Sequence, residues 1–165
     1  MAEPMKPEPL KFAIVSRADL RDGKLHATWD DPQRLGSMSE PKRRAMLDNP
    51  LALSDSEPVQ LVALQGNRPI GRIDLIAGRI LVNDSPQPVF WGSALMVPEE
   101  HRATLAGAYL VMRLPTLAPT LCPTLVAHGV SQMALPLYSK LKWAHLTLRR
   151  MIVLRRSRSV VQRFL

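Results

Sequence analysis

The chain has 165 residues, of which 46% are apolar and 22% charged, a composition that excludes a disordered chain and fits a single globular domain. No apolar stretch is long enough to span a bilayer, the N-terminus lacks the apolar centre of a secretory signal, and one cysteine excludes an internal disulfide. We therefore expect a soluble, cytoplasmic protein.

The net charge of +8 is divided unevenly along the chain. Residues 1–100 hold 12 basic and 14 acidic side chains, whereas residues 101–165 hold 10 basic side chains and no acidic one. A half of the chain in which every charged side chain is basic indicates an anionic partner, such as a phosphate-rich cofactor, an anionic membrane surface or nucleic acid. The alternative is a basic surface that serves solubility or packs against an acidic domain.

The N-terminal part is polar and irregular. Residues 1–10 alternate Pro, Glu and Lys and are predicted to form a flexible tail. A short apolar run predicts a first strand over residues 12–15, and the polar sequence from 18 to 49 predicts one or two short helices. One of these helices is expected to start at Ser39, with Pro41 in its first turn.

Three strands are predicted next, joined by turn sequences into an antiparallel meander. They occupy residues 59–64, residues 70–77 with an extension to 82, and residues 89–97. In the second strand, alternation places Ile70, Arg72, Asp74 and Ile76 on one face, with Ile73 and Leu75 on the other. The third strand is nearly continuous in apolar residues and is expected to be buried on both faces.

The hydrophobic period changes after Pro98, where a buried helix is predicted over residues 102–114. Three prolines are then expected to cut the chain into short pieces. The remaining predicted elements are a buried strand over residues 124–128, a helix over residues 132–142 with Met133, Leu137 and Leu141 on one face, and a last strand over residues 144–154.

This order of elements predicts an α/β (α+β) domain over residues 11–155, with a mixed, mostly antiparallel central sheet flanked by helices. Residues 156–165 form a basic segment with three open explanations: a second domain covers it, another subunit completes the sheet there, or it lies on an anionic membrane. Nucleic-acid binding is less well supported, because few aromatic residues lie among the arginines.

Two segments carry a more specific signal. The first runs Leu95-Met-Val-Pro-Glu-Glu-His-Arg-Ala-Thr-Leu-Ala-Gly107, and the second runs Ser131-Gln-Met-Ala-Leu-Pro-Leu-Tyr-Ser-Lys-Leu-Lys-Trp143. Together they resemble the two signature segments of the GNAT superfamily of acyl-CoA-dependent N-acyltransferases, over roughly residues 59–155. Within the superfamily, the resemblance is nearest to bacterial proteins that end in a similar tyrosine segment followed by basic residues.

The resemblance implies acetyl-CoA or another acyl-CoA as acyl donor. Backbone amides after Arg102 would hold its pyrophosphate at a helix N-terminus, the strand at Leu95 would pair with its pantetheine arm and point an amide at the thioester oxygen, and Tyr138 would protonate the leaving thiolate. The implied cofactor-binding residues are Leu95, Met96, Val97, Arg102, Ala103, Thr104, Leu105, Ala106, Gly107 and Ser131.

The chain departs from the family pattern at several positions. Leu105 and Ala103 stand where glycines are common, and a side chain there narrows the approach to a phosphate. Lys142 replaces the glycine that usually ends the second helix, and costs roughly 1 kcal/mol if it adopts the left-handed conformation. Pro136 lies in the predicted helix, which must therefore begin late or kink. Ser131 stands where the family often has Asn.

No general base is obvious from the sequence. The available groups are Asp74, Glu99, Glu100, His101 and His128. His128, at the end of a predicted central strand, is the preferred catalytic candidate, although a lone histidine there is more often structural. Cys122 is expected to be a buried apolar residue rather than a nucleophile, and we expect no metal site.

Three functions stay open. The first is an enzyme that transfers an acyl group, most simply acetyl, to a primary amine of a small molecule, a sugar or a protein, with a longer acyl group as a variant. The second is a catalytically degenerate GNAT domain that binds a protein partner or acyl-CoA without turnover. The candidate partners are a second copy in a homo-oligomer or a second domain, joined through the C-terminal strand. The third is a binder of anionic surfaces.

Overall fold

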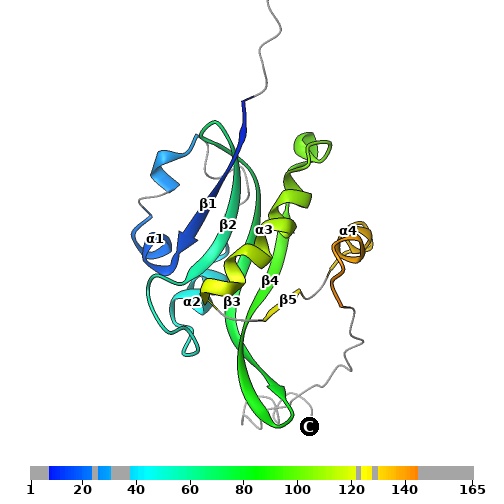
Figure 1. The fold of residues 1–165 in the computed structure, drawn as a ribbon. Helices are drawn as coiled ribbons and strands as arrows, with labels where there is room; N and C mark the ends of the chain where they lie inside the picture. The colour runs from blue at the N-terminus through cyan, green and yellow to red at the C-terminus, as the bar shows by residue number, and fades with distance from the viewer. Residues whose placement is uncertain (1–7, 24–25, 31–37, 122–123, 128–129, 145–165) are drawn as a thin grey trace, which may run out of the picture.

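The computed structural model describes residues 8–23, 26–30, 38–121, 124–127 and 130–144 (Figure 1). Its centre is a sheet of five strands in the order β1-β2-β3-β4-β5. The strands are β1 Leu10–Ser16, β2 Pro58–Gln65, β3 Arg68–Val82, β4 Ser85–Met96 and β5 Leu125–Ala127. Strands β1 to β4 pair with one another in antiparallel fashion, whereas β5 runs parallel to β4. The predicted mixed, mostly antiparallel sheet and its meander are thus confirmed.

Helices pack on both faces of this sheet. They are α1 Arg17–Asp22, α2 Glu40–Leu47, α3 Ala106–Leu121 and α4 Leu135–Lys140. On one face, Leu20 of α1 and Met46 of α2 join a core cluster with Val62 of β2. On the other face, α3 lies across the sheet (Figure 1) and inserts Leu110 and Leu114 into a second cluster. Among the described helices, none is long and apolar enough to cross a membrane.

The two N-terminal helices begin where the sequence places their start signals. Ser16 and Asp19 form a reciprocal cap for α1, in which the Asp19 N–H donates to Ser16 Oγ at 3.1 Å and the Ser16 N–H donates to the Asp19 carboxylate at 2.9 Å. Ser39 precedes α2 and Pro41 lies in its first turn, as predicted.

The predicted faces of the second meander strand were wrong for one residue. The pairing of β2 with β3 shifts between Ala63 and Leu64, and Ile70 is the extra residue at this step. Ile70 therefore packs in the same core cluster as Ile73, rather than on the face of Arg72 and Asp74. A bulge of this kind shifts the alternation of side chains by one position and leaves no mark in the hydrophobic pattern.

Strand β4 is buried only in its middle part, between Val89 and Gly92. Val89 and Phe90 are buried, but Ala94 and Met96 are exposed. The prediction of a fully buried strand was wrong because β5 pairs with β4 only as far as Gly92. The part of β4 that follows has no outer strand among the described residues.

Helix α3 starts later and ends later than predicted. Residues 99–101 form a short 3-10 turn, and α3 begins only at Ala106. It continues through Pro115, because the fixed φ of proline is compatible with a helix even though one backbone hydrogen bond is lost. Tyr109 and Met112 are 41% and 48% exposed, so the helix is buried along one side rather than all round.

Helix α4 is shorter than the prediction. It begins at Leu135, with Pro136 in its first turn, so the proline sets a late start rather than a kink. Met133 precedes the helix and is 83% exposed, and therefore does not share its buried side with Leu137. The predicted last strand from residue 144, Cys122 and the basic C-terminal segment lie outside the described residues, apart from residue 144 itself, which belongs to no strand.

The hairpin of β3 and β4 extends beyond the rest of the sheet. We call residues 79–88 the β3–β4 arm, because its two halves pair only with each other, from Arg79 opposite Pro88 to Val82 opposite Ser85. Its tip turns through Asn83 and Asp84, both with positive φ. Leu81 near the tip is 73% exposed.

Candidate functional site

A cavity of about 140 Å³ lies where β4 loses its outer neighbour. Ser93, Ala94 and Leu95 of β4 line one side of it, and Ser131, Ala134 and Tyr138 line another. The separation of β4 from β5 beyond Gly92 creates this space, since a strand pairing with Ser93 and its successors would fill it. The cavity thus brings together Leu95, Ser131 and Tyr138, three of the residues selected from the sequence.

The cavity wall on β4 contains a bulge. Asp74 of β3 lies opposite Ser93, but Arg72 lies opposite Met96, so β4 has one residue more than β3 over this interval. Ala94 has a φ of 49°, a left-handed conformation that costs a residue with a side chain about 1–3 kcal/mol. The bulge leaves part of the backbone at Ala94 and Leu95 free of the ladder with β3. Ala94 was missed in the sequence, because alanine has no preference for this conformation.

The other two residues predicted on this strand lie beside the cavity rather than in its lining. Met96 pairs with Arg72 of β3. The Val97 side chain faces α3, since Cβ atoms added at Gly71 and Gly107 would lie 3.2 and 3.4 Å from Val97 Cγ2. Gly71 thereby lets β3 and the start of α3 approach closely, with Leu110 Cδ1 only 3.1 Å from its virtual Cβ.

Tyr138 is held in a mostly apolar setting. It is 7% exposed, and burial raises the pKa of its phenol above the usual value. The hydroxyl therefore keeps its proton at neutral pH and can act as a donor. After α4, Lys142 adopts a φ of 59°, which confirms the left-handed conformation considered for this position.

In the segment before α3, some backbone N–H groups have a hydrogen-bond acceptor within the chain and others do not. The N–H groups of Arg102 and Thr104 donate to the carbonyls of Glu99 and His101 at 3.1 and 3.0 Å. The Ala106 N–H has only a long contact of 3.4 Å to Thr104 Oγ1. Within the described part of the chain, the amides of Ala103, Leu105 and Gly107 meet no acceptor. Leu105, 64% exposed, projects its side chain into solvent beside them.

The candidate bases are scattered. Asp74 is fully buried and ion-paired with Lys42, so it is not free to accept a proton from a substrate. Glu99 and Glu100 are exposed in the turn before α3. His101 is half-buried in the same turn, and its Nε2 atom is buried without a hydrogen-bond partner among the described residues. His128 lies outside the described residues.

A polar cluster on the α1/α2 face of the sheet was not selected as a site. Gln60, Asp74 and Ser93 lie opposite one another on three successive strands. Gln60 donates to Asp74 at 2.9 Å and also bonds His26. Burial, opposed by the hydrogen bond to Gln60, lowers the pKa of His26, so its imidazole is neutral at neutral pH. Only alternation in β3, which places Arg72 and Asp74 together, could have indicated this cluster.

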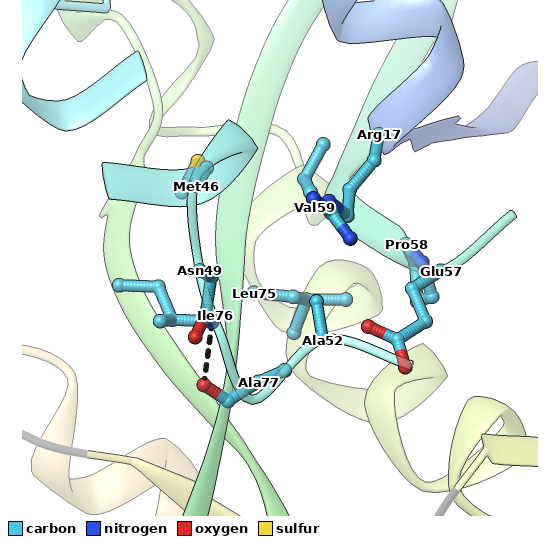
Figure 2. A pocket seen from close by; sticks show the side chains of 10 residues that line it. All are labelled: Arg17, Met46, Asn49, Ala52, Glu57, Pro58, Val59, Leu75, Ile76 and Ala77. Carbon is cyan, nitrogen blue, oxygen red and sulfur yellow. Dashed lines mark hydrogen bonds between the residues drawn. The ribbon is translucent and has the colours of Figure 1, made fainter. Parts of the chain in front are cut away.

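A second hollow on the same face is too small for a substrate. It has a volume of about 10 Å³ and lies among Arg17, Met46, Glu57 and Leu75 (Figure 2). Asn49, at its rim, donates to the Ala77 carbonyl at 2.8 Å and ties the end of α2 to β3. This hollow belongs to the packing of α2 on the sheet.

The chain has the fold of the GNAT N-acetyltransferases, to whose solved structures it aligns over most of its length. A GCN5-related N-acetyltransferase from Ralstonia eutropha aligns with a TM-score of 0.56 and 20% identity, over 88% of this chain and 99% of that one. Neither a protein-family model nor a curated protein matches the sequence.

Two further similar structures are acetyltransferases named for the acceptors they modify. An aminoglycoside acetyltransferase from an uncultured soil metagenomic sample, in complex with sisomicin, aligns with a TM-score of 0.57 and 15% identity, over 88% of this chain and 97% of that one. Glucosamine-6-phosphate N-acetyltransferase from Arabidopsis thaliana aligns with a TM-score of 0.56 and 12% identity, over 90% and 100%. At these identities the likeness establishes the fold.

Proposed function

We propose that the chain is an acyltransferase that moves an acyl group, most simply acetyl, from coenzyme A to the primary amine of a small molecule. The observation that carries this proposal is the cavity beside β4, where the bulge at Ala94 faces Tyr138 across a space of about 140 Å³. Backbone N–H groups can stabilise the oxyanion that forms when a thioester is attacked, and a protonated phenol can donate its proton to the leaving sulfur.

Acyl-CoA would supply an acyl group activated as a thioester. The free amides of Ala103, Leu105 and Gly107 suit its phosphates, because the N-terminus of a 16-residue helix carries a partial positive charge and α3 has no acidic residue in its first turn. Arg102 is exposed beside these amides and adds a full positive charge. Leu95 and Ser131 of the cavity wall would contact the pantetheine part of acyl-CoA, which carries the thioester.

The chain's own groups then have two tasks. Backbone N–H groups at the bulge would stabilise the negative charge that develops on the carbonyl oxygen, a contribution of about 3–4 kcal/mol in other acyl-transfer enzymes. Tyr138 would donate its proton to the leaving sulfur as the new C–N bond forms and the C–S bond breaks. The amine must lose a proton, and we propose His128 as the general base that takes this proton, directly or through water.

A second candidate function is a GNAT domain that binds acyl-CoA or a partner without turnover. The internal hydrogen bonds of the Arg102 and Thr104 amides favour it, because they leave fewer donors for a pyrophosphate than the sequence pattern implies. The exposed Leu105 side chain adds bulk at the same place. Binding without catalysis distinguishes this candidate from the first.

Calorimetric titration with acetyl-CoA, then with CoA and a long-chain acyl-CoA, tests the donor site. We expect micromolar binding that Arg102→Glu weakens at least about tenfold, as expected for loss of a charge-assisted contact. Arg79→Glu, an equal change of charge on the exposed β3–β4 arm, should bind like the wild type. If the folded chain binds none of the three ligands, the proposed enzymatic activity is refuted, and the chain is a GNAT-fold domain that does not use acyl-CoA.

A further inference from the structure

Arg72 occupies a distinctive position on β3. It lies opposite Met96, beside the step in pairing that produces the bulge at Ala94. Because residues two apart on a strand share a face, Arg72 lies on the same face as Asp74, which is bound by Lys42 of α2. The intervening Ile73 packs in the cluster under α3. Arg72 therefore lies on the α1/α2 face of the sheet, one strand away from the candidate acyl-transfer site.

The side chain of Arg72 is largely buried, and its Nε atom has no hydrogen-bond partner among the described residues. The side chain is 10% exposed, and the Nε atom is fully covered. The nearest carboxylate oxygen, Asp74 Oδ1, is 3.9 Å from Nε, too far for a hydrogen bond. A guanidinium has five N–H donors, and the 3.9 Å contact with Asp74 is a long ion pair that satisfies none of them as a hydrogen bond.

The neighbouring groups do not compensate this charge. Both oxygens of Asp74 are already engaged, Oδ1 by Gln60 at 2.9 Å and Oδ2 by Lys42. His26 is held neutral by burial and contributes no negative charge. Among the described residues, this cluster holds two cations, Lys42 and Arg72, and one carboxylate, Asp74, so one positive charge is in excess. A planar guanidinium in this state is suited to an oxyanion, which it binds through two parallel N–H groups.

We propose that Arg72 binds a carboxylate or phosphate of the acceptor substrate, which is therefore a small primary amine that also carries an oxyanion. This inference rests on the proposed acyl transfer. Residues opposite each other on antiparallel strands have Cα atoms about 4.5–5.5 Å apart. An acceptor anchored at Arg72 on the α1/α2 face thus has its amine within reach of the bulge on β4, while the donor approaches from the side of α3.

Matched pairs of amines test the role of Arg72 in the reaction. Phosphoethanolamine is compared with ethanolamine, and glycine with glycinamide, in the wild type and in Arg72→Gln. We expect the substitution to lower kcat/KM about 10- to 100-fold for the anionic member of a pair, mainly through KM, and less than about threefold for its neutral partner. Since each amine is compared with itself in two proteins, differences in amine pKa cancel. An equal loss for both members would overturn the proposal.

A binding readout tests the site without turnover. With CoA present to occupy the amides before α3, inorganic phosphate should raise the melting temperature of the full chain above that in chloride of equal ionic strength, and Arg72→Gln should lose this difference. Arg79→Gln should keep it. Without phosphate, Arg72→Gln should melt no lower than the wild type, since the substitution removes a largely buried charge whose contact with Asp74 is long. A phosphate effect that survives in Arg72→Gln, or a large loss of stability without phosphate, means that Arg72 is structural.

Two further measurements separate the possible failures. Arg72→Lys keeps the charge but not the paired donors, and should retain part of the phosphate effect if Arg72→Gln folds poorly. Acetyl-CoA titration of the same samples tests the proposed function independently. Acetyl-CoA binding with an unchanged phosphate effect in Arg72→Gln refutes this inference alone, whereas a phosphate effect that depends on Arg72 without acetyl-CoA binding refutes the acyltransferase and leaves the oxyanion site.

Discussion

The rings of Tyr138 and Trp143 meet edge to face, with centroids 5.1 Å apart and an interplanar angle of 80°. The backbone N–H of Trp143 also donates to the backbone carbonyl of Tyr138 at 3.1 Å, which turns the chain back at the end of α4. These two contacts fix the phenol against the cavity wall, and an edge-to-face pair contributes about 0.5–1.5 kcal/mol beyond burial. The aromatic residue after α4 is therefore a support for Tyr138.

Replacing Tyr138 with Phe should separate this support from catalysis. The variant keeps the ring contact with Trp143 but loses the hydroxyl, so we expect a fall in kcat of about 10²–10⁴-fold with little change in acetyl-CoA affinity. Release of free thiol in the presence of an amine acceptor measures kcat, and calorimetry measures affinity. Tyr109→Phe, on the exposed side of α3, is the matched control and should retain activity. Full activity in Tyr138→Phe would exclude a proton donor at this position.

Replacing Lys142 with glycine should stabilise the folded chain. Because its φ of 59° is unfavourable for a residue with a side chain, Lys142→Gly should raise the free energy of unfolding by up to about 1 kcal/mol. Urea unfolding at neutral pH measures the change. Lys140→Gly removes the same charge inside α4 and should instead lower the free energy of unfolding by about 1 kcal/mol. Destabilisation by both substitutions would show that Lys142 makes contacts that outweigh its strain.

His26 makes stability depend on pH on the acid side. Burial lowers the pKa of His26 in the folded chain, so below about pH 6.5 the unfolded chain takes up a proton that the folded chain resists. The contribution is therefore complete above the unfolded pKa and is lost as the pH falls through the folded pKa. Melting temperatures from pH 8 to pH 5 should fall less steeply for His26→Gln than for the wild type. Identical slopes would contradict this assignment.

Gly107 should show opposite effects on stability and binding. Its virtual Cβ lies 3.4 Å from Val97 Cγ2, an ordinary contact, so Gly107→Ala fits and should raise the free energy of unfolding by about 0.5–1 kcal/mol. The same methyl group narrows the approach of a phosphate to the free amides of α3, and acetyl-CoA affinity should fall. Gly71→Ala, whose Cβ would lie 3.1 Å from Leu110 Cδ1, should lower stability instead. Unchanged affinity in a stabilised Gly107→Ala would place the phosphates elsewhere.

The sequence predicted the elements better than their irregularities. Strand positions followed from apolar runs, and the start of α2 followed from Ser39 and Pro41, because these signals are local. The bulges at Ile70 and Ala94 were not predictable, since neither residue type signals a bulge and only the register with a neighbour reveals the extra residue. The late start of α3 has a similar cause, because the turn before it depends on Thr104 bonding His101.

The candidate site was predicted in part. Leu95, Ser131 and Tyr138 come together at the cavity, as their motifs suggested, because the chain spacing between the two segments is a property of the fold. Arg72 was placed with Asp74 by alternation, but the missing hydrogen bond of its Nε atom depends on Gln60 and Lys42, which occupy Asp74 from other elements. Pairing among buried charges is decided in three dimensions, and a sequence pattern does not contain it.

The β3–β4 arm divides the sheet into two parts with different local stability. A two-stranded ribbon without a third strand or a helix against it is marginally stable in water, and the described residues place neither along Arg79–Val82. Amide protons there should exchange with solvent through brief local openings, while those of β2 and the adjoining half of β3 exchange only when the whole domain unfolds. The exposed Leu81 then becomes a point of entry for proteases long before the core opens.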